Sequence, residues 1–347
     1  MIEAEASRRT RILEWAGVAV CVIALSVTSL VWVSRHGFTL YFGDAEAHLN
    51  IARRIIDSRT PGVDQFGTVW LPVPHLLMLP FVWNDELWRT GLAGGIASAI
   101  AFVAASLLIY ATTRRLFDQA IAAASAVAVF ALNPNILYLQ SIPMTECAFF
   151  AALLGLLFTS VWFHQTRSVW AALAAAAFSN IASMTRYEGW FLISFVALYL
   201  LWAGGRRRWW AAFLFGAVAS IGPLLWLGFN WWNYRNPLEF YNGPYSAKAI
   251  YERGRKDFPG EHHWIASAHY FWEAARLTLG LPLILMGLGG AGLAAWRRRW
   301  WPVLLLAAPP AFYVWSMYGS GAEIHVPTLW PHSYYNTRYG TTLAPLL

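Results

Sequence analysis

Two polar residues near the start of the chain have types and spacing suited to proton transfer. Asp44 and His48 lie one helical turn apart in the segment YFGDAEAHLNIARRIID, with Glu46 between them. On a helix Asp44 and His48 would share one face. A carboxylate next to an imidazole could accept a proton from a bound substrate. The simpler alternative is that Asp44 is the N-cap of the helix and His48 is solvated.

Other candidate residues stand at the ends of long apolar runs. Glu146 follows Thr145 where one apolar run begins, and it would stabilise a helix N-terminus in any case. Arg186 and Glu188 lie in TRYEGW between two further runs, and Tyr335 and Arg338 lie in HSYYNTRYG. The planar donor fork of arginine suits a phosphate group, so Arg186 and Arg338 are candidate phosphate ligands. An interfacial ion pair and an aromatic belt are the ordinary alternatives.

The sequence gives little support for a metal or disulfide site. It has no CxxC, HExxH or glycine-rich phosphate loop, and its two cysteines, Cys21 and Cys147, both lie in apolar runs. His262 and His263 are adjacent, and neighbouring side chains point in different directions on most backbones. No motif therefore supports a divalent metal cofactor, and no disulfide framework is expected.

The composition indicates a membrane protein. Of the 347 residues 58% are hydrophobic, only 12% are charged, and 21 are tryptophan. A soluble protein of this size could not bury so much apolar surface and still present a charged exterior. The composition excludes a soluble enzyme, a disordered chain and a secreted disulfide scaffold. Short alternating segments typical of a β-barrel are absent, so we predict an all-α polytopic membrane protein.

Nine uncharged apolar stretches are long enough, or nearly so, to cross a bilayer, which needs about 20 residues per helix. The predicted spans are 15–34, 91–112, 119–139, 147–163, 168–184, 189–205, 209–232, 277–296 and 300–318. A tenth is expected to begin near Thr341. Because the sequence stops at TTLAPLL, we expect the natural protein to continue past Leu347. The whole of 1–347 is predicted to be one transmembrane domain.

The distribution of arginine predicts the orientation. Twelve of the 25 basic residues lie in the N-terminal segment and in alternate short connections, together with four of the 18 acidic residues. That side of the membrane therefore has a net charge of +8, and the other side, with 13 basic and 14 acidic residues, has −1. The positive-inside rule places the N-terminus and these connections in the cytoplasm. The net charge of +7 therefore reflects topology, not binding to nucleic acid. The arginines before the first span could also begin a signal peptide, but VWVSRHG offers no small-residue cleavage site, which favours a retained anchor.

The longer connections, 35–90, 233–276 and 319–340, all fall on the outer side. In the first, an apolar stripe of Ala45, Leu49, Ala52 and Ile56 predicts an amphipathic helix on the membrane surface. The stretch WLPVPHLLMLPFVW at 70–83 is too short to span and predicts a re-entrant or interfacial segment. Any chemistry is therefore expected on the outer face. Nucleotide-activated donors are not available there in bacteria, so a lipid-linked donor is expected.

In order and sidedness, these segments resemble the GT-C integral-membrane glycosyltransferases. The resemblance is to bacterial members related to protein O-mannosyltransferases and lipid A aminoarabinose transferases (family 39). The segments that carry it are GDAEAH in the first outer loop, MTE at the fourth span, TRYEGW and YNTRYG. The lone acidic residue of MTE departs from members that hold a metal between two acidic motifs.

The resemblance implies a GT-C helix bundle that transfers a sugar, with inversion, from a polyprenyl-phosphate donor to an acceptor hydroxyl. It assigns the catalytic base to an acidic residue of the first outer loop, here Asp44. Inverting transfer also needs cations at the departing phosphate, a role for Arg186 and Arg338. The expected sugar or positioning contacts are Glu46, His48, Glu146, Glu188 and Tyr335. The expected location is the bacterial inner membrane, with the active face periplasmic or extracellular; the acceptor is not readable.

Two other classes of function are alternatives for this sequence. A transporter usually places ionisable groups or broken helices near the bilayer midplane, whereas here the acidic residues gather at the outer ends of the spans. A structural or assembly protein is the second class. Among enzymes, an oligosaccharide transferase or ligase of the same fold is the alternative.

Overall fold

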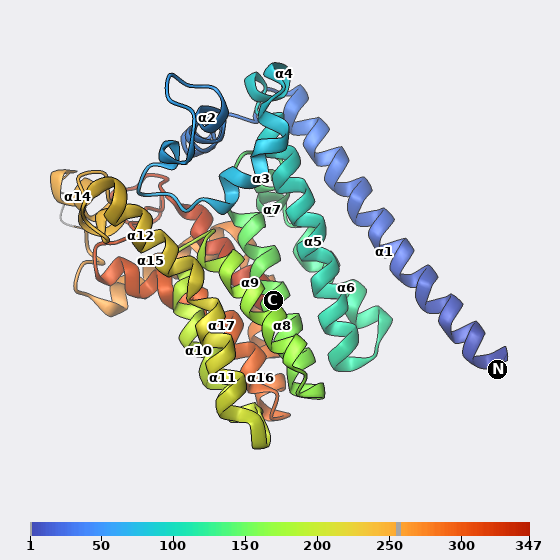
Figure 1. Ribbon diagram of the computed structural model, residues 1–347. Coiled ribbons are helices and arrows are strands. Elements are labelled where there is room, and N and C mark those ends of the chain that lie inside the picture. The colour runs from blue at the N-terminus through green and yellow to red at the C-terminus, as the bar shows by residue number, and fades with distance from the viewer. Residues whose placement is uncertain (1, 255–257) are drawn as a thin grey trace.

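The computed structural model describes residues 2–254 and 258–347 (Figure 1). In these residues the regular structure is helical, and strand-like pairing is limited to one isolated bridge between His325 and Tyr335. The predicted all-α class is confirmed. The helices are α1 (Ile2–Arg35), α2 (Gly43–Ile56), η1 (Val63–Phe66), α3 (Val73–Val82), α4 (Asp85–Arg89), α5 (Leu92–Phe117), α6 (Ala120–Ala131), α7 (Pro134–Leu139), α8 (Glu146–Thr166), α9 (Val169–Ser183), α10 (Glu188–Ala203), η2 (Gly205–Arg207), α11 (Arg208–Ala219), α12 (Ile221–Tyr234), α13 (Glu239–Asn242), α14 (Ala247–Gly254), α15 (Trp264–Leu279), α16 (Leu281–Trp296), α17 (Trp300–Tyr318) and η3 (Thr337–Leu346).

Helix α8 is the central element of the bundle. Of its most apolar stretch 78% is buried, against 17% for α1, which lies at the periphery (Figure 1). The α8 residues Phe149 and Phe150 are fully buried. The close packing of α8 on α9 depends on Gly155, since an added Cβ would lie 2.3 Å from the ring of Phe178. Side-chain packing of this density leaves room only for glycine there.

Long apolar helices confirm an integral membrane protein. Among residues 2–254 and 258–347, four helical segments are long and apolar enough to cross a bilayer, namely Arg9–Arg35, Leu92–Phe117, Glu146–Thr166 and Gly205–Tyr234, and the bent pair α15 and α16 passes the same test when taken together. Each overlaps a predicted span. Helices α9 and α10 match two further predicted spans but have only 15 and 16 residues. The number of crossings, nine or ten, stays a prediction.

The predicted span 119–139 is not one helix. It is divided into α6 and α7, because Pro134 has no backbone N–H to continue the ladder. The side chain of Asn133 accepts hydrogen bonds from the backbone N–H groups of Asn135 and Ile136 and so caps α7. The chain thus turns before it reaches Glu146.

The predicted boundary at residue 277 is also wrong. Helix α15 already begins at Trp264, and α15 and α16 meet at an angle of 110°. The bend falls at Gly280, whose φ of +83° favours glycine, and Pro282 follows in the first turn of α16. The predicted loop 233–276 is therefore largely helical, with its residues 255–257 outside the described part of the chain.

The segment Thr337–Leu346 forms a 3₁₀ helix, η3, and not the start of a tenth α-helical span. This segment packs closely on α15, since a Cβ at Gly340 would lie 2.5 Å from the backbone of Ala274. Pro345 inside the segment removes a backbone donor, which is unfavourable for a regular α-helix. This packing buries most of the side chain of Arg338, the second residue of η3.

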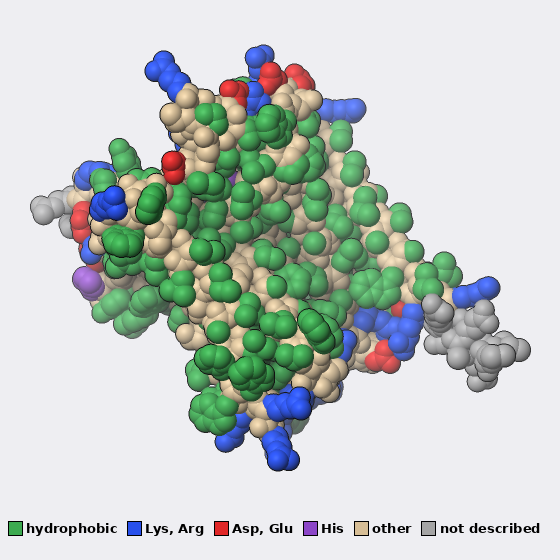
Figure 2. Space-filling model, viewed as in Figure 1, with side chains coloured by type: hydrophobic (Ala, Val, Ile, Leu, Met, Phe, Trp, Pro, Cys, Tyr) green, Lys and Arg blue, Asp and Glu red, His purple; other side chains and the backbone are tan. Residues whose placement is uncertain are grey.

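The short basic connections gather at one end of the bundle. Arg115 donates to the side chain of Gln165, and Arg299 donates to the backbone carbonyl of Leu116, so the turns after α5, α8 and α16 meet. Figure 2 shows Lys and Arg side chains at this lower end and mainly hydrophobic side chains over the middle of the visible face. The three longer connections lie toward the opposite end (Figure 1).

Candidate active site

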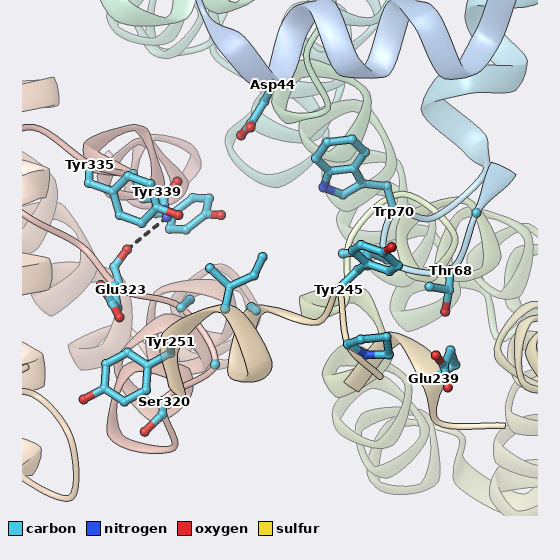
Figure 3. Close-up of a pocket in the computed structure, with 18 of the residues that line it drawn as sticks. Asp44, Thr68, Trp70, Glu239, Tyr245, Tyr251, Ser320, Glu323, Tyr335 and Tyr339 are labelled. Atoms are coloured by element: carbon cyan, nitrogen blue, oxygen red, sulfur yellow. Dashed lines mark hydrogen bonds between the residues drawn. The ribbon is translucent and has the colours of Figure 1, made fainter. Parts of the chain in front are cut away.

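A cavity of about 1170 Å³ opens between the three longer connections. Its walls come from α2 and the stretch 66–70, from residues 234–251, and from residues 320–339. Figure 3 shows Asp44 on one side of this space, Tyr335, Tyr339 and Glu323 on another, and Trp70 and Tyr245 facing them. Segments predicted to share one side of the membrane therefore converge on one cavity.

Asp44 is positioned by the amphipathic character of α2. The predicted stripe is correct, since Ala45, Leu49 and Ala52 are buried and Ile56 packs beside them. Asp44 is not the N-cap, however. That position belongs to Phe42, which makes no side-chain capping bond. The carboxylate of Asp44 instead forms an ion pair with Arg338, and it stays partly exposed at the cavity wall.

Arg338 connects Asp44 to Glu146. Its Nη2 donates to Asp44 Oδ2 at 2.6 Å, and its Nε donates to Glu146 Oε1 at 3.0 Å. The guanidinium lies over the rings of Phe42 and Tyr339, 4.7 and 4.9 Å from their centroids. Cation–π contacts of this kind strengthen when the cation is desolvated. Two ion pairs and two aromatic rings therefore fix the position of Arg338 behind Asp44.

Arg186 forms the second half of the same network. Its Nη1 donates to Glu146 Oε1 at 3.1 Å and its Nε donates to Glu188 Oε1 at 2.6 Å. Tyr313 receives a hydrogen bond from Arg186 and donates one to Glu188 Oε1 at 2.7 Å. The predicted pair of Arg186 and Glu188 is thus present, but it is buried and not an exposed interfacial pair.

The ionic network combines three carboxylates with two guanidinium groups, namely Asp44, Glu146, Glu188, Arg186 and Arg338. Glu146 is almost fully buried, with 1% of its side chain exposed, so its charge depends on both arginines. Its second oxygen, Oε2, is buried and has no hydrogen-bond partner among the described residues. A buried carboxylate oxygen without a partner is unfavourable, so burial of Glu146 depends all the more on the two arginines that bind its other oxygen.

His48 is buried, and this excludes the solvated imidazole of the simpler alternative. Its Nδ1 lies 2.9 Å from His75 Nε2, and its ring lies 4.5 Å from that of Trp70. Burial lowers the pKa of His48 to about 3, with the positive charges of Arg338 and Arg186 acting in the same direction. His48 is therefore neutral near pH 7, and it supports Trp70 from behind the cavity wall.

The remaining predicted site residues separate into two groups. Tyr335 lines the cavity and is half exposed, whereas Glu46 is exposed on α2 and is not among the residues lining the cavity. Glu146 and Glu188 lie behind the wall with the two arginines. Within the described residues, no group of three or more His, Cys, Asp or Glu side chains is arranged to hold a metal ion.

Sequence reasoning missed several residues that the structure brings to the site. Tyr313 lies inside a predicted span, where nothing distinguished it from a packing residue. Arg54 lines the cavity, but in the sequence nothing distinguished it from the neighbouring Arg53 in α2. Glu239 begins the short helix α13 and Glu323 lies in a loop, both in segments of mixed charge. Only the folded chain shows that Glu239 and Glu323 lie close to the other cavity residues, and their neighbours in the sequence do not indicate this.

Part of the chain matches the model of a known protein family. Residues 89–232 match the family described as dolichyl-phosphate-mannose-protein mannosyltransferase. This segment is related to the GT-C mannosyltransferases. It covers somewhat under half of the chain and includes Glu146, Arg186 and Glu188, but not Asp44 or Arg338. No curated protein and no solved structure gives a significant match.

The match to the GT-C mannosyltransferases supports a coarse assignment of function. Together with the long apolar helices it indicates a membrane glycosyltransferase of the mannosyltransferase-like kind. The matched segment supplies Glu146, Arg186 and Glu188 of the ionic network, whereas Asp44, which lines the cavity, and Arg338 lie outside it. The match names neither the sugar nor the acceptor for this chain.

Proposed function

We propose that this protein transfers a sugar, with inversion, from a polyprenyl-phosphate-linked donor to an acceptor hydroxyl at the outer face of the bacterial inner membrane. The observation that carries the proposal is the position of Asp44. Its carboxylate lines the cavity and is anchored from behind by Arg338 at 2.6 Å. A partly exposed carboxylate with a fixed orientation is suited to take a proton from a bound hydroxyl.

The proposed reaction uses the chain's own residues in three roles. Asp44 accepts the proton as the acceptor oxygen bonds to the anomeric carbon. The bond from that carbon to the phosphate oxygen breaks at the same time, and the phosphate leaves with the electron pair. Arg338 and Arg186 lie behind the cavity wall, so in this proposal their fixed positive charge acts on the departing phosphate through the wall and not by direct contact. Arg54, on the cavity wall, is a third cation for the lipid phosphate.

Support for the outer face comes from charge and loop length. The basic turns meet at one end of the bundle, and basic turns favour the cytoplasmic side. The cavity is built by connections at the opposite end, where a lipid-linked donor can be delivered from within the membrane. The ionisable groups Glu146 and Glu188 also occupy first turns of α8 and α10, not positions in the middle of helices. This placement favours an enzyme over a transporter.

The donor class can be tested directly with purified protein. Synthetic polyprenyl-phosphate mannose and a nucleotide-linked mannose would be offered separately in detergent micelles. The proposal expects release of polyprenyl phosphate and no use of the nucleotide sugar. Consumption of the nucleotide sugar, or turnover without release of the lipid phosphate, would contradict the donor assignment. The anomeric configuration of the product, read by NMR, tests inversion.

A further inference from the structure

The cavity is larger than a single sugar at Asp44 requires. Its volume of about 1170 Å³ exceeds the ~300–1,000 Å³ that is usual for small-ligand pockets. The walls away from Asp44 carry Glu239, Tyr245, Tyr251 and Glu323, which the proposed transfer does not use (Figure 3). These walls are available to a second substrate, the acceptor.

The lining is unusually rich in tyrosine. Of the 25 described residues that line the cavity, eight are aromatic and six of these are tyrosine, whereas only three are branched aliphatic residues. A tyrosine presents a flat apolar face and a polar tip, and it loses little conformational entropy on binding. A sugar ring has the matching character, with C–H groups on its faces and hydroxyl groups at its edge. A lipid chain would be better matched by aliphatic residues.

The charge of the lining disfavours an anionic acceptor. Glu323 contacts His325, whose Nε2 lies 3.0 Å from Glu323 Oε2, and Glu239 accepts a hydrogen bond from Asn236 at 2.9 Å. In the described part of the chain neither carboxylate forms an ion pair with lysine or arginine, and Arg54 is the only arginine on the wall. An anionic acceptor would bring its negative charge next to these carboxylates, which repel it. Carboxylates do accept hydrogen bonds from hydroxyl groups.

The backbone around the cavity disfavours an extended peptide. Peptides in extended form are commonly held by main-chain hydrogen bonds along a free sheet edge. Over the described residues the only strand-like pairing is the bridge between His325 and Tyr335, which already uses those backbone groups. Recognition at this cavity must therefore rest on side chains.

We propose that the acceptor is an uncharged carbohydrate, whose rings stack on the tyrosines of the cavity and whose hydroxyl groups bind Glu239 and Glu323. This inference rests on the proposed function for the position of the reacting hydroxyl near Asp44. The glycan can be free or attached to a lipid carrier, because the same ring chemistry is recognised in both forms.

Binding without donor tests the inference. Isothermal titration would compare mannotriose, its octyl glycoside, trigalacturonic acid and a threonine-containing hexapeptide on the purified protein. Tyr245→Ala and Glu323→Gln would be compared with Tyr41→Ala, which changes an exposed tyrosine outside the cavity lining. We expect mannotriose or its octyl glycoside to bind, about tenfold more weakly to the two cavity variants and normally to Tyr41→Ala. Binding of the octyl glycoside alone indicates a lipid-borne glycan.

Three results would overturn the inference. These are equal or tighter binding of trigalacturonic acid, cavity-dependent binding of the peptide alone, and no binding of either mannotriose form. Binding of polyprenyl-phosphate mannose, measured on the same preparation, separates this inference from the proposed function. If the lipid donor binds and the sugars do not, only the acceptor class is wrong. If the sugars bind and the donor does not, the proposed donor is wrong.

Discussion

The carboxylate of Asp44 accepts a hydrogen bond from the guanidinium of Arg338 across 294 residues of sequence. This contact joins the first long connection of the chain to the last. Arg338 also donates to Glu146, which shares its Oε1 atom with Arg186. Charges from four separate segments thus form one continuous network, and its end at Asp44 is the part that faces the cavity.

The first prediction concerns Arg338. Arg338→Lys keeps the charge but loses the planar fork that reaches Asp44 and Glu146 at once. We expect the affinity for polyprenyl-phosphate mannose to fall by about tenfold, which is ~1.4 kcal/mol. Arg53→Lys is a matched control, because Arg53 also bridges two carboxylates, Asp57 and Asp85. An unchanged affinity in Arg338→Lys, or an equal fall in Arg53→Lys, would refute the assignment.

The second prediction concerns stability. Arg186→Met leaves Glu146 and Glu188 buried without one of their cationic partners. Breaking a buried pair in this way typically destabilises a protein by about 3–5 kcal/mol. Unfolding in detergent would be compared with that of Arg59→Met, an exposed change expected to stay within about 0.5 kcal/mol. Equal stability of the two variants would show that the network does not hold the fold.

The third prediction concerns pH. In the folded protein the pKa of His48 is lowered to about 3, whereas the unfolded chain has an ordinary value of about 6.5. Between these values the unfolded state binds a proton that the folded state does not. The free energy of unfolding should therefore decrease as pH falls below about 6.5, by up to ~1.4 kcal/mol per pH unit from this group.

His48→Gln removes this contribution and should flatten the pH dependence of unfolding between about pH 6.5 and 5. The slope, not the absolute stability, is the measurement, because the variant also loses the contact with His75. His36→Gln provides the control, since His36 is exposed at the end of α1. Identical slopes for the wild type and His48→Gln would mean that His48 is not kept neutral by burial.

The fourth prediction concerns topology. With Cys21 replaced by alanine, a cysteine at Ile250 on the cavity wall should react with a membrane-impermeant maleimide in intact cells, and a cysteine at Arg207 should not. Ile250 is 53% exposed, so access to the side chain does not limit labelling. Labelling of position 207 from outside, with position 250 protected, would reverse the orientation and remove the outer-face assignment.

Much of the fold follows from local patterns in the sequence. The apolar stripe of α2 and the apolar runs of α5 and α8 carry their own periodicity and length, so their predicted positions agree with the structure. The bend at Gly280 was not predicted, since the polar residues of α15 conceal a helix that is half buried by tertiary packing. The cap assigned to Asp44 was wrong because a distant arginine outweighs a local backbone contact.

The candidate site shows the same division between local and distant information. Asp44, Glu146, Arg186, Glu188 and Arg338 could be selected from the sequence, because charges are rare here and these stand at the ends of apolar runs. Their direct contacts could not, since each contact with Arg338 depends on how η3 packs. Tyr313 could not be selected at all, because an aromatic residue in an apolar helix is ordinary until its hydroxyl is seen between Arg186 and Glu188.

The most direct test of the account is the rate of sugar transfer by Asp44→Asn, compared with Asp85→Asn. Both changes remove the charge from an aspartate that pairs with an arginine, but only Asp44 lines the cavity. Asparagine can still accept a hydrogen bond from Arg338, although it cannot take a proton from the acceptor. We expect turnover to fall by about 10²-fold or more in Asp44→Asn, with normal folding and near-normal turnover in Asp85→Asn. Full turnover by a folded Asp44→Asn protein would contradict the role of Asp44 as the base.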